Sequence, residues 1–238
     1  MTEFLTNHPY LIANLPVLLS LLACAAVARP SEYKKMAWKS GWLCLPGSFA
    51  ALLHNASYWN PVRVGNGPIG IEDFLFTLTV GLLAWLLAGF PFRRRLRMEE
   101  RPLLWATRLG ISYAAFCVLC GCLWLAGVES LPNTLGAGGI ALVLLLLLRP
   151  DLWILAAAGS LLFTTVYLFL IKLQFAVWPN FVLQWNPNGT LGTAILGIPS
   201  GEIVFAVLFG AGMPVYMAFL FDVTIRKVPP HDGSGITV

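Results

Sequence analysis

The stretch that decides the fold is residues 71–97, IEDFLFTLTVGLLAWLLAGFPFRRRLR. It begins with two acids, continues through residues 74–92 without a charge, and ends in a cluster of arginines. A helix needs about 20 mostly apolar residues to cross a bilayer. Lys and Arg concentrate on the cytoplasmic side of such helices. The stretch therefore predicts a membrane-spanning helix whose arginine end faces the cytoplasm.

The same pattern extends over the whole chain. Of its 238 residues, 58% are hydrophobic and 11% are charged, and the mean hydropathy is +0.77. Soluble domains carry roughly 25% charged residues, so most of the outer surface of this protein must contact lipid. The net charge is +4, but the basic residues lie between apolar runs and form no groove for phosphates. We therefore expect the lipid bilayer as a partner and no nucleic acid.

Apolar runs of spanning length recur along the sequence and predict an all-α polytopic membrane protein with about seven transmembrane helices. The first run has no basic start and no clear cleavage site, so we expect a retained helix and not a removed signal peptide. The predicted spans run approximately over 9–28, 40–57, 71–91, 105–127, 133–149, 152–175 and 202–222.

Basic residues fall on alternate loops between these spans. Most of the 15 Lys and Arg follow the first, third, fifth or seventh span, whereas the opposite loops keep only Arg63. By the positive-inside rule the basic loops are cytoplasmic. We expect a multi-pass protein of the cell (inner) membrane with its N-terminus outside and its C-terminus in the cytoplasm. The basic residues concerned are Arg29, Lys34, Lys35, Lys39, Arg93, Arg94, Arg95, Arg97, Arg101, Arg149, Arg226 and Lys227.

The two longest outer loops share a pattern that indicates an internal duplication. Both contain Trp-Asn-Pro, at 59–61 and at 185–187, and later an acid at the start of a span. When Asp73 is aligned with Glu202, a Phe follows three residues later and a Gly eight residues later in both copies. The matched residues are Phe76 with Phe205 and Gly81 with Gly210.

The duplication predicts two three-helix units separated by one spacer helix, a 3+1+3 arrangement. Because the spacer is a single helix, both units have the same orientation, and both acidic motifs face the outer side. The predicted segments are a first repeat at 1–92, a basic cytoplasmic loop and spacer helix at 93–130, a second repeat at 131–224, and a polar cytoplasmic tail at 225–238.

Three of the eleven acids, Glu72, Asp73 and Glu202, lie in the first turns of the third and seventh spans. The helix dipole favours acids there, so one interpretation is that they stabilise the helix starts. Ionisable groups that enter a membrane are costly, however, and are usually functional. Neighbouring phenylalanines would exclude water and favour the protonated form, which can act as a general acid. We predict that all three are catalytic.

Aromatic and amide side chains beside the acids are candidates for substrate binding. Trp and Tyr often lie at the membrane interface as anchors. The alternative is that their ring faces stabilise a cation. The two Asn would brace the loops or form hydrogen bonds with the acids. The candidates are Trp59, Asn60, Phe76, Trp185, Asn186 and Phe205.

Two further residues are candidates for tuning the charge of the acids. Lys172 lies within the sixth span, where it either extends to the interface or pairs with a carboxylate. His54, near the outer end of the second span, is a candidate proton relay. No His lies near Cys117, Cys120 and Cys122 to complete a metal site, and zinc normally takes four ligands, so we expect no metal.

At the two acidic motifs the sequence resembles the membrane-embedded lycopene cyclase domain family of carotenoid biosynthesis, the type with two homologous three-helix units. Members carry Pro-x-Glu-Glu or Pro-x-Glu-Asp at the start of a helix after a loop with Trp and Asn. The corresponding stretches here are 69–76, IGIEDFLF, and 198–205, IPSGEIVF. Gly70 stands where the family usually has proline, and Gly201 stands where the first acid of the second copy would lie.

The resemblance implies a redox-neutral cyclisation of a linear polyene without a cofactor. An acid protonates the terminal double bond, a neighbouring double bond attacks the carbocation, and a base removes a proton. The acid and base set would be Glu72 or Asp73 together with Glu202. A lipid-soluble polyene or isoprenoid would be the substrate, and a homo-oligomer or other carotenoid-pathway enzymes are partners that the sequence leaves open.

Two other functions remain open from the sequence. The first is the same chemistry on another linear isoprenoid lipid. The second is a transporter or a non-catalytic membrane partner, because transporters are often duplicated bundles with interrupted helices. Gly210, Gly212 and Pro214 would interrupt the seventh span in that case. Against transport, the acids lie at one face and little charge lies at mid-depth.

Overall fold

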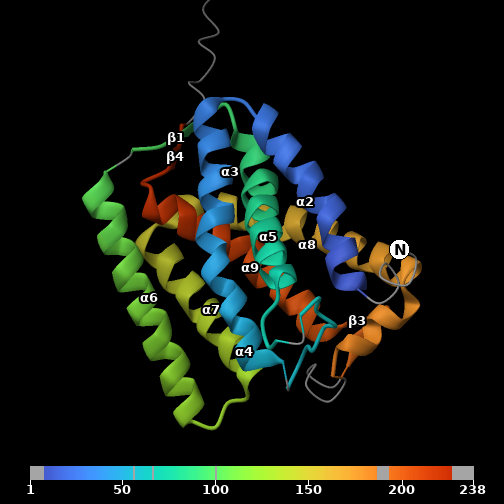
Figure 1. Cartoon of the computed structure of the whole chain (residues 1–238). Helices are drawn as coiled ribbons and strands as arrows, with labels where there is room; N and C mark the ends of the chain where they lie inside the picture. Colours follow the sequence, from blue (N-terminus) through green and yellow to red (C-terminus); the bar gives the residue numbers. More distant parts are fainter. Residues whose placement is uncertain (1–7, 56, 66, 100, 187–192, 227–238) are drawn as a thin grey trace, which may run out of the picture.

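The computed structural model describes residues 8–55, 57–65, 67–99, 101–186 and 193–226, which form a helical bundle (Figure 1). Six of the described helices are long and apolar enough to cross a membrane. The predicted all-α polytopic membrane fold is therefore confirmed. The six are α2 (Pro9–Val27), α5 (Ile71–Gly89), α6 (Pro102–Leu125), α7 (Ser130–Leu148), α8 (Trp153–Val177) and α9 (Ser200–Leu220).

The second predicted span differs from the expectation. The chain is helical from Ser31 to His54, in three pieces: α3 (Ser31–Cys44), the 3-10 helix η1 (Leu45–Ala50) and α4 (Ala51–His54). Pro46 has no amide hydrogen to donate, which explains the change to 3-10 geometry at this point. The helix begins well before residue 40, so Lys34, Lys35 and Lys39 lie on α3 and not in a loop.

The ends of the bundle have opposite character. Short connections at one end, here called the basic end, carry the arginines between α5 and α6. They include η2 (Phe90–Phe92), β1 (Leu96–Arg97), η3 (Pro150–Leu152) and β4 (Thr224–Ile225). The other end, here called the acidic end, carries the starts of α5 and α9 together with α4. It also contains η4 (Pro179–Gln184), β2 (Ala194–Ile195) and β3 (Ile198–Pro199).

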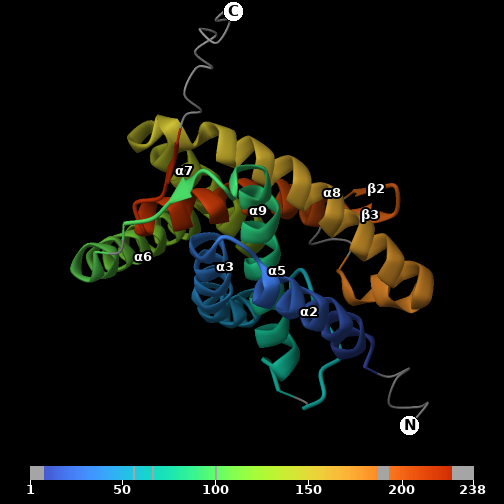
Figure 2. The same ribbon diagram turned by 90° about the horizontal axis from the view of Figure 1, so that it is seen from above.

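Helices α5 and α9 lie at the centre of the bundle and pack on each other. Helix α3 packs along α5, and α8 packs along α9 (Figure 2). Helix α6 lies at the periphery beside α7, and none of its residues is buried. Helix α9 runs without interruption through Pro214. The two helices whose first turns carry the acids are therefore the two most central ones.

Glycines bring neighbouring helices close together in both halves. A Cβ at Gly81 of α5 would lie 2.7 Å from the Ser40 carbonyl oxygen of α3. A Cβ at Gly159 of α8 would collide with the Gly210 carbonyl oxygen of α9. Small residues allow this close packing, which is the main way helices associate where lipid removes the hydrophobic driving force.

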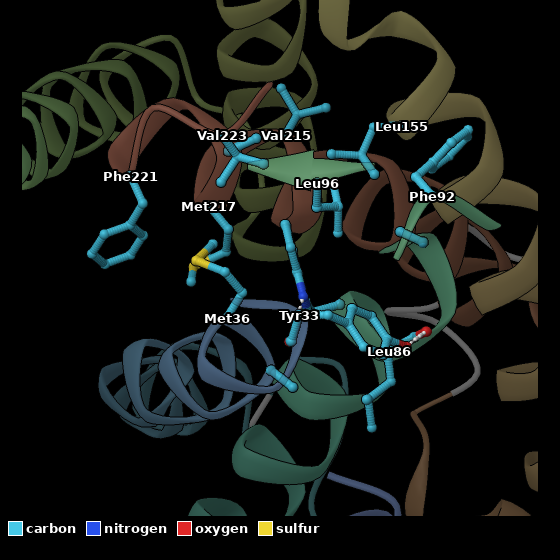
Figure 3. Close-up of a cluster of buried hydrophobic side chains, with 14 of the residues drawn as sticks. Tyr33, Met36, Leu86, Phe92, Leu96, Leu155, Val215, Met217, Phe221 and Val223 are labelled. Atoms are coloured by element: carbon cyan, nitrogen blue, oxygen red, sulfur yellow. Dashed lines mark hydrogen bonds between the residues drawn. The ribbon is translucent and has the colours of Figure 1, made fainter. Parts of the chain in front are cut away.

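The largest hydrophobic core lies toward the basic end, where side chains of α3, α5, α8 and α9 point toward one another (Figure 3). The Tyr33 hydroxyl donates to the Leu86 carbonyl, and Trp85 Nε1 donates to the Tyr33 carbonyl at 3.2 Å. Strands β1 and β4 pair antiparallel across this end, with Leu96 opposite Ile225. Most of the predicted polar tail at 225–238 lies outside the described residues.

Candidate functional site

The two Trp-containing loops meet at the acidic end and pair with each other. Trp59 and Trp185 form an isolated antiparallel bridge, and their rings stack with centroids 5.7 Å apart. The Asn60 amide donates to the Gln184 carbonyl at 3.0 Å, and the Asn186 amide donates to the Tyr58 carbonyl at 2.7 Å. The residues on either side of the two tryptophans thus exchange equivalent bonds, which is the ordinary pattern of an antiparallel bridge. The domain boundaries of the repeat stay a prediction.

Glu202 is held by hydrogen-bond donors from both loops and from α8. It lies in the first turn of α9 and is 6% exposed. The Tyr58 hydroxyl and Trp185 Nε1 donate to its Oε1 at 2.5 and 2.9 Å. The Tyr167 hydroxyl donates to its Oε2 at 2.6 Å. All three donors are neutral groups, and Glu202 forms no salt bridge within the described residues.

The Tyr58 phenol is suited to donate to Glu202. Burial raises the pKa of Tyr58 well above its ordinary value, and the neighbouring Glu202 carboxylate raises it further. The hydroxyl hydrogen is therefore retained at every physiological pH. A phenol can also accept a hydrogen bond through its oxygen, so it can stay in contact with Glu202 in either protonation state.

Asp73, which the predicted duplication aligns with Glu202, has a different set of partners. Arg63 donates to both carboxylate oxygens, from Nε at 2.6 Å and from Nη2 at 3.1 Å, and each of the two side chains is 3% exposed. The Gly70 amide donates to Asp73 Oδ2 at 2.8 Å, which caps the start of α5. The Tyr10 hydroxyl makes a longer contact of 3.5 Å with Oδ1. Asp73 thus both caps a helix and belongs to a buried ion pair.

Glu72 is fully buried beside this pair, with 0% exposure. Its Oε1 accepts the Val64 amide at 2.7 Å, so it holds the loop that leads into α5. Its Oε2 is buried without a hydrogen-bond partner among the described residues. Of the three predicted catalytic acids, none is exposed to solvent.

Aromatic rings fill the space around the paired loops and link the two acids. The Tyr10 ring contacts Trp59 edge-on at 4.6 Å between centroids. Phe76 lies 5.8 Å from Trp59, and Phe205 lies 5.6 Å from Tyr167. We call the group at the loops the aromatic cluster: Tyr10, Tyr58, Trp59, Phe76, Phe175, Trp178, Phe181 and Trp185.

Other predicted residues lie away from the carboxyl groups. The Lys172 ammonium is exposed and donates to the Leu196 carbonyl at 2.9 Å, not to a carboxylate. His54 contacts the Ser130 hydroxyl at 3.3 Å through Nδ1. Asn60 and Asn186 are exposed and join the loops through their backbone amides. The interpretation of Lys172 as an interface residue fits this geometry better than pairing with an acid.

Sequence reasoning gave no role to Arg63, to Tyr167 or to the Tyr58 hydroxyl. Arg63 carried a usable signal, because it was the one basic residue of the predicted outer loops. A basic residue that departs from the positive-inside pattern needs a local partner, and Asp73 is that partner. No sequence signal placed Tyr167 beside Glu202, since the two residues lie on different helices.

The two glycines that depart from the family motif both lie where a side chain does not fit. A Cβ at Gly70 would collide with Glu72 Oε2 and would lie 3.0 Å from Arg63 Cδ. A Cβ at Gly201 would lie 2.9 Å from Leu131 Cδ2 and 3.0 Å from the Tyr58 hydroxyl. Each glycine therefore makes room for the contacts of an adjacent acid.

No protein-family model matches the chain, and no curated protein or solved structure matches it either. The resemblance to the lycopene cyclase domain family consequently rests on the motif residues quoted above.

Proposed function

We propose that this protein is an integral-membrane enzyme that cyclises a linear isoprenoid lipid, with a lycopene-type carotenoid as the first substrate to test. The observation that carries the proposal is Glu202, a buried carboxyl group in contact with aromatic side chains that come from both halves of the chain. A carboxyl group in such surroundings is suited to acid catalysis on a substrate that is itself dissolved in lipid.

The proposed reaction conserves protons and electrons. The neutral Glu202 carboxyl gives its proton to a terminal C=C bond, which forms a C–H bond and a carbocation. A second C=C bond of the same molecule attacks that cation, so a ring C–C bond forms and the positive charge moves to another carbon. The Glu202 carboxylate then removes a proton from the adjacent carbon, and a new C=C bond forms. The product is an isomer of the substrate, so no redox cofactor is required.

The aromatic cluster supports the cationic steps of this reaction. Faces of Trp and Tyr rings attract a cation by about 0.5 to 2 kcal/mol each when water is excluded. Trp59 and Trp185 stack on each other beside Glu202, and Phe205 lies one turn further along α9. Tyr58, Tyr167 and Trp185 hold the carboxyl group in one orientation for both proton transfers.

Expression in a lycopene-accumulating bacterium tests the proposal. We expect cyclised pigments of unchanged mass, separated by chromatography, and we expect Glu202→Gln to abolish them while the protein stays in the membrane. Glu99→Gln is the matched control, because Glu99 is an exposed acid in an ion pair at the basic end. No pigment change with the wild-type protein in the membrane excludes lycopene. A mass-neutral conversion of another linear isoprenoid in lipid extracts would then identify the substrate.

The proposal includes an orientation. The acidic end faces outward from the inner membrane, the N-terminus is outside, and the C-terminus is in the cytoplasm. The support is the arginine-rich connection between α5 and α6, together with Arg149 and Arg226 at the same end. A fluorescent reporter fused after Val238 should be active, because green fluorescent protein folds in the cytoplasm. If instead the same fusion to a reporter that works only on the outer side of the inner membrane were active, this orientation would be wrong.

A further inference from the structure

Arg63 is a buried cation at the acidic end of the bundle, away from the arginines of the basic end. Its side chain is 3% exposed and contacts Asp73 through two donors. Its Nη2 also donates to Asn55 Oδ1 at 2.9 Å. Removing one member of such a pair leaves the other as an unpaired buried charge, which is strongly destabilising. The two side chains therefore stabilise the fold only as a pair.

We infer that Arg63 is a positioning residue that fixes Asp73 as a permanently ionised carboxylate, which leaves Glu202 as the one of these two corresponding acids that exchanges protons. The second half of this inference rests on the proposed function. The first half is a statement about charge and packing that holds whatever the substrate is.

The partners of the two acids differ in whether they permit a proton to be taken up. Asp73 Oδ2 already accepts hydrogen bonds from Arg63 Nε and the Gly70 amide, and Oδ1 accepts from Arg63 Nη2 and makes the longer contact with the Tyr10 hydroxyl. Neither a guanidinium group nor a backbone N–H group can accept a hydrogen bond. Protonating Asp73 would therefore leave the buried Arg63 guanidinium without its counter-charge.

Glu202 has no such restriction at Oε2. Its partner there is the Tyr167 hydroxyl, which can donate to a carboxylate and accept from a carboxylic acid. A proton can be added to or removed from Oε2 while both Oε1 donors, Tyr58 and Trp185, stay in place. The geometry of the carboxyl group is thus the same in both protonation states.

Arg63 also positions the loop that supplies one donor to Glu202. The Asn55 side chain accepts a hydrogen bond from Arg63 and donates one from Nδ2 to the Pro68 carbonyl at 2.5 Å. These bonds join the end of α4, the loop before α5, and the start of α5. Tyr58 lies in the chain between Asn55 and Arg63, so the ion pair holds in place the segment from which the Tyr58 hydroxyl reaches Glu202.

A double-mutant cycle on the full-length protein in detergent tests the ion pair. Arg63→Gln and Asp73→Asn should each lower the unfolding midpoint strongly, whereas the double variant should recover most of the loss, because it contains no unpaired charge. The exposed pair Arg101 and Glu99 is the control and should show additive, small shifts. Additive shifts at Arg63 and Asp73 would overturn the inference.

Infrared difference spectroscopy tests the charge state without any need for activity. The band of protonated carboxyl groups should be unchanged in Asp73→Asn, because Asp73 is ionised in the wild-type protein. Loss of intensity in this variant would show that Asp73 carries a proton and would overturn the inference even if no cyclised product is ever found.

Pigment analysis tests the division of roles. The stable double variant Arg63→Gln/Asp73→Asn should retain cyclase activity within about tenfold, a change of about 1.4 kcal/mol in the barrier, while Glu202→Gln has none. A double variant that is as stable as wild type but inactive would assign the proton transfer to Asp73. If the wild-type protein forms no cyclised product, the proposed function fails, while the unfolding cycle and the infrared band still decide whether Arg63 fixes Asp73.

Discussion

Asp73 and Glu202 are aligned with each other by the predicted duplication, and both lie in the first turn of a central helix, yet their surroundings differ. Asp73 is paired with the Arg63 guanidinium and accepts a backbone amide, and the Tyr10 hydroxyl makes only a longer contact with it. Glu202 faces two phenols and an indole, and the phenols can both donate and accept. A carboxyl group at the start of a central helix is thus held by a cation in one case and by neutral donors in the other.

The difference between the two sites arises from residues outside the shared motif. Arg63 lies in the loop before α5, and Tyr167 lies on α8. A short motif therefore identifies where an acid lies but not what it does. The hydrogen-bond partners of the acid determine its chemistry. These partners come from segments outside the motif, where the two halves of the sequence differ.

The largest effect that we predict near Glu202 comes from introducing an acid at Gly201, where the family motif has one. In Gly201→Glu the new side chain would meet Leu131 and the Tyr58 hydroxyl, which lie 2.9 and 3.0 Å from the added Cβ. Overpacking of this kind costs about 1 to 3 kcal/mol. We expect a lower unfolding midpoint and loss of pigment cyclisation, because Tyr58 is displaced from Glu202.

Gly212→Ala is the control for this prediction, since Gly212 lies on the same helix and has nothing within 4 Å of an added Cβ. It should leave both the midpoint and the pigments unchanged. A more active Gly201→Glu protein would show instead that the second site lacks an acid that it needs.

A partial loss of cyclisation is expected from removing one phenol hydroxyl at a time. Tyr167→Phe and Tyr58→Phe each delete one hydrogen bond to a carboxyl group, which is worth about 1.5 to 3 kcal/mol when the acceptor is charged. We expect Tyr167→Phe to lower the cyclisation rate more than Tyr58→Phe does, because Tyr167 alone contacts Oε2. Rates in membranes with added substrate provide the measurement.

The ranking of these two phenols is a direct test of how the second site handles its proton. Equal losses in the two variants would mean that the proton is not confined to Oε2. Tyr216→Phe is a suitable control on α9, because Tyr216 contacts the core nearer the basic end and not Glu202.

Much of the fold followed from the sequence because a bilayer imposes simple rules. A spanning helix must be about 20 apolar residues long, and its loops must carry basic residues on one side. These rules placed six helices close to their observed bounds. They failed for the second span because α3 has three lysines and the helix contains Pro46, so its apolar part is shorter than the helix itself.

The site was only partly predictable, for a physical reason. The positions of Glu72, Asp73 and Glu202 at helix starts follow from local sequence, and so do the flanking Trp residues. Their hydrogen-bond partners depend on which helices pack together, and that information is not local. The bond from Tyr167 to Glu202 depends on the close packing of α8 and α9 at Gly159 and Gly210, which no charge or hydropathy pattern reveals.

The smallest predicted effect separates the two tryptophans at the loop pair. Trp185→Phe removes the Nε1 donor to Glu202 and should slow cyclisation by up to about tenfold, which corresponds to the loss of one hydrogen bond of about 1.4 kcal/mol. Trp59→Phe should slow it less, because an aromatic face remains and Trp59 Nε1 has no hydrogen-bond partner among the described residues. Both changes remove the same atoms from one ring of the same stacked pair, so their packing costs largely cancel in the comparison. If the two variants were equally slow, stacking and not the bond to Glu202 would explain why each loop carries a tryptophan, and the two halves would be more alike in function than their acids suggest.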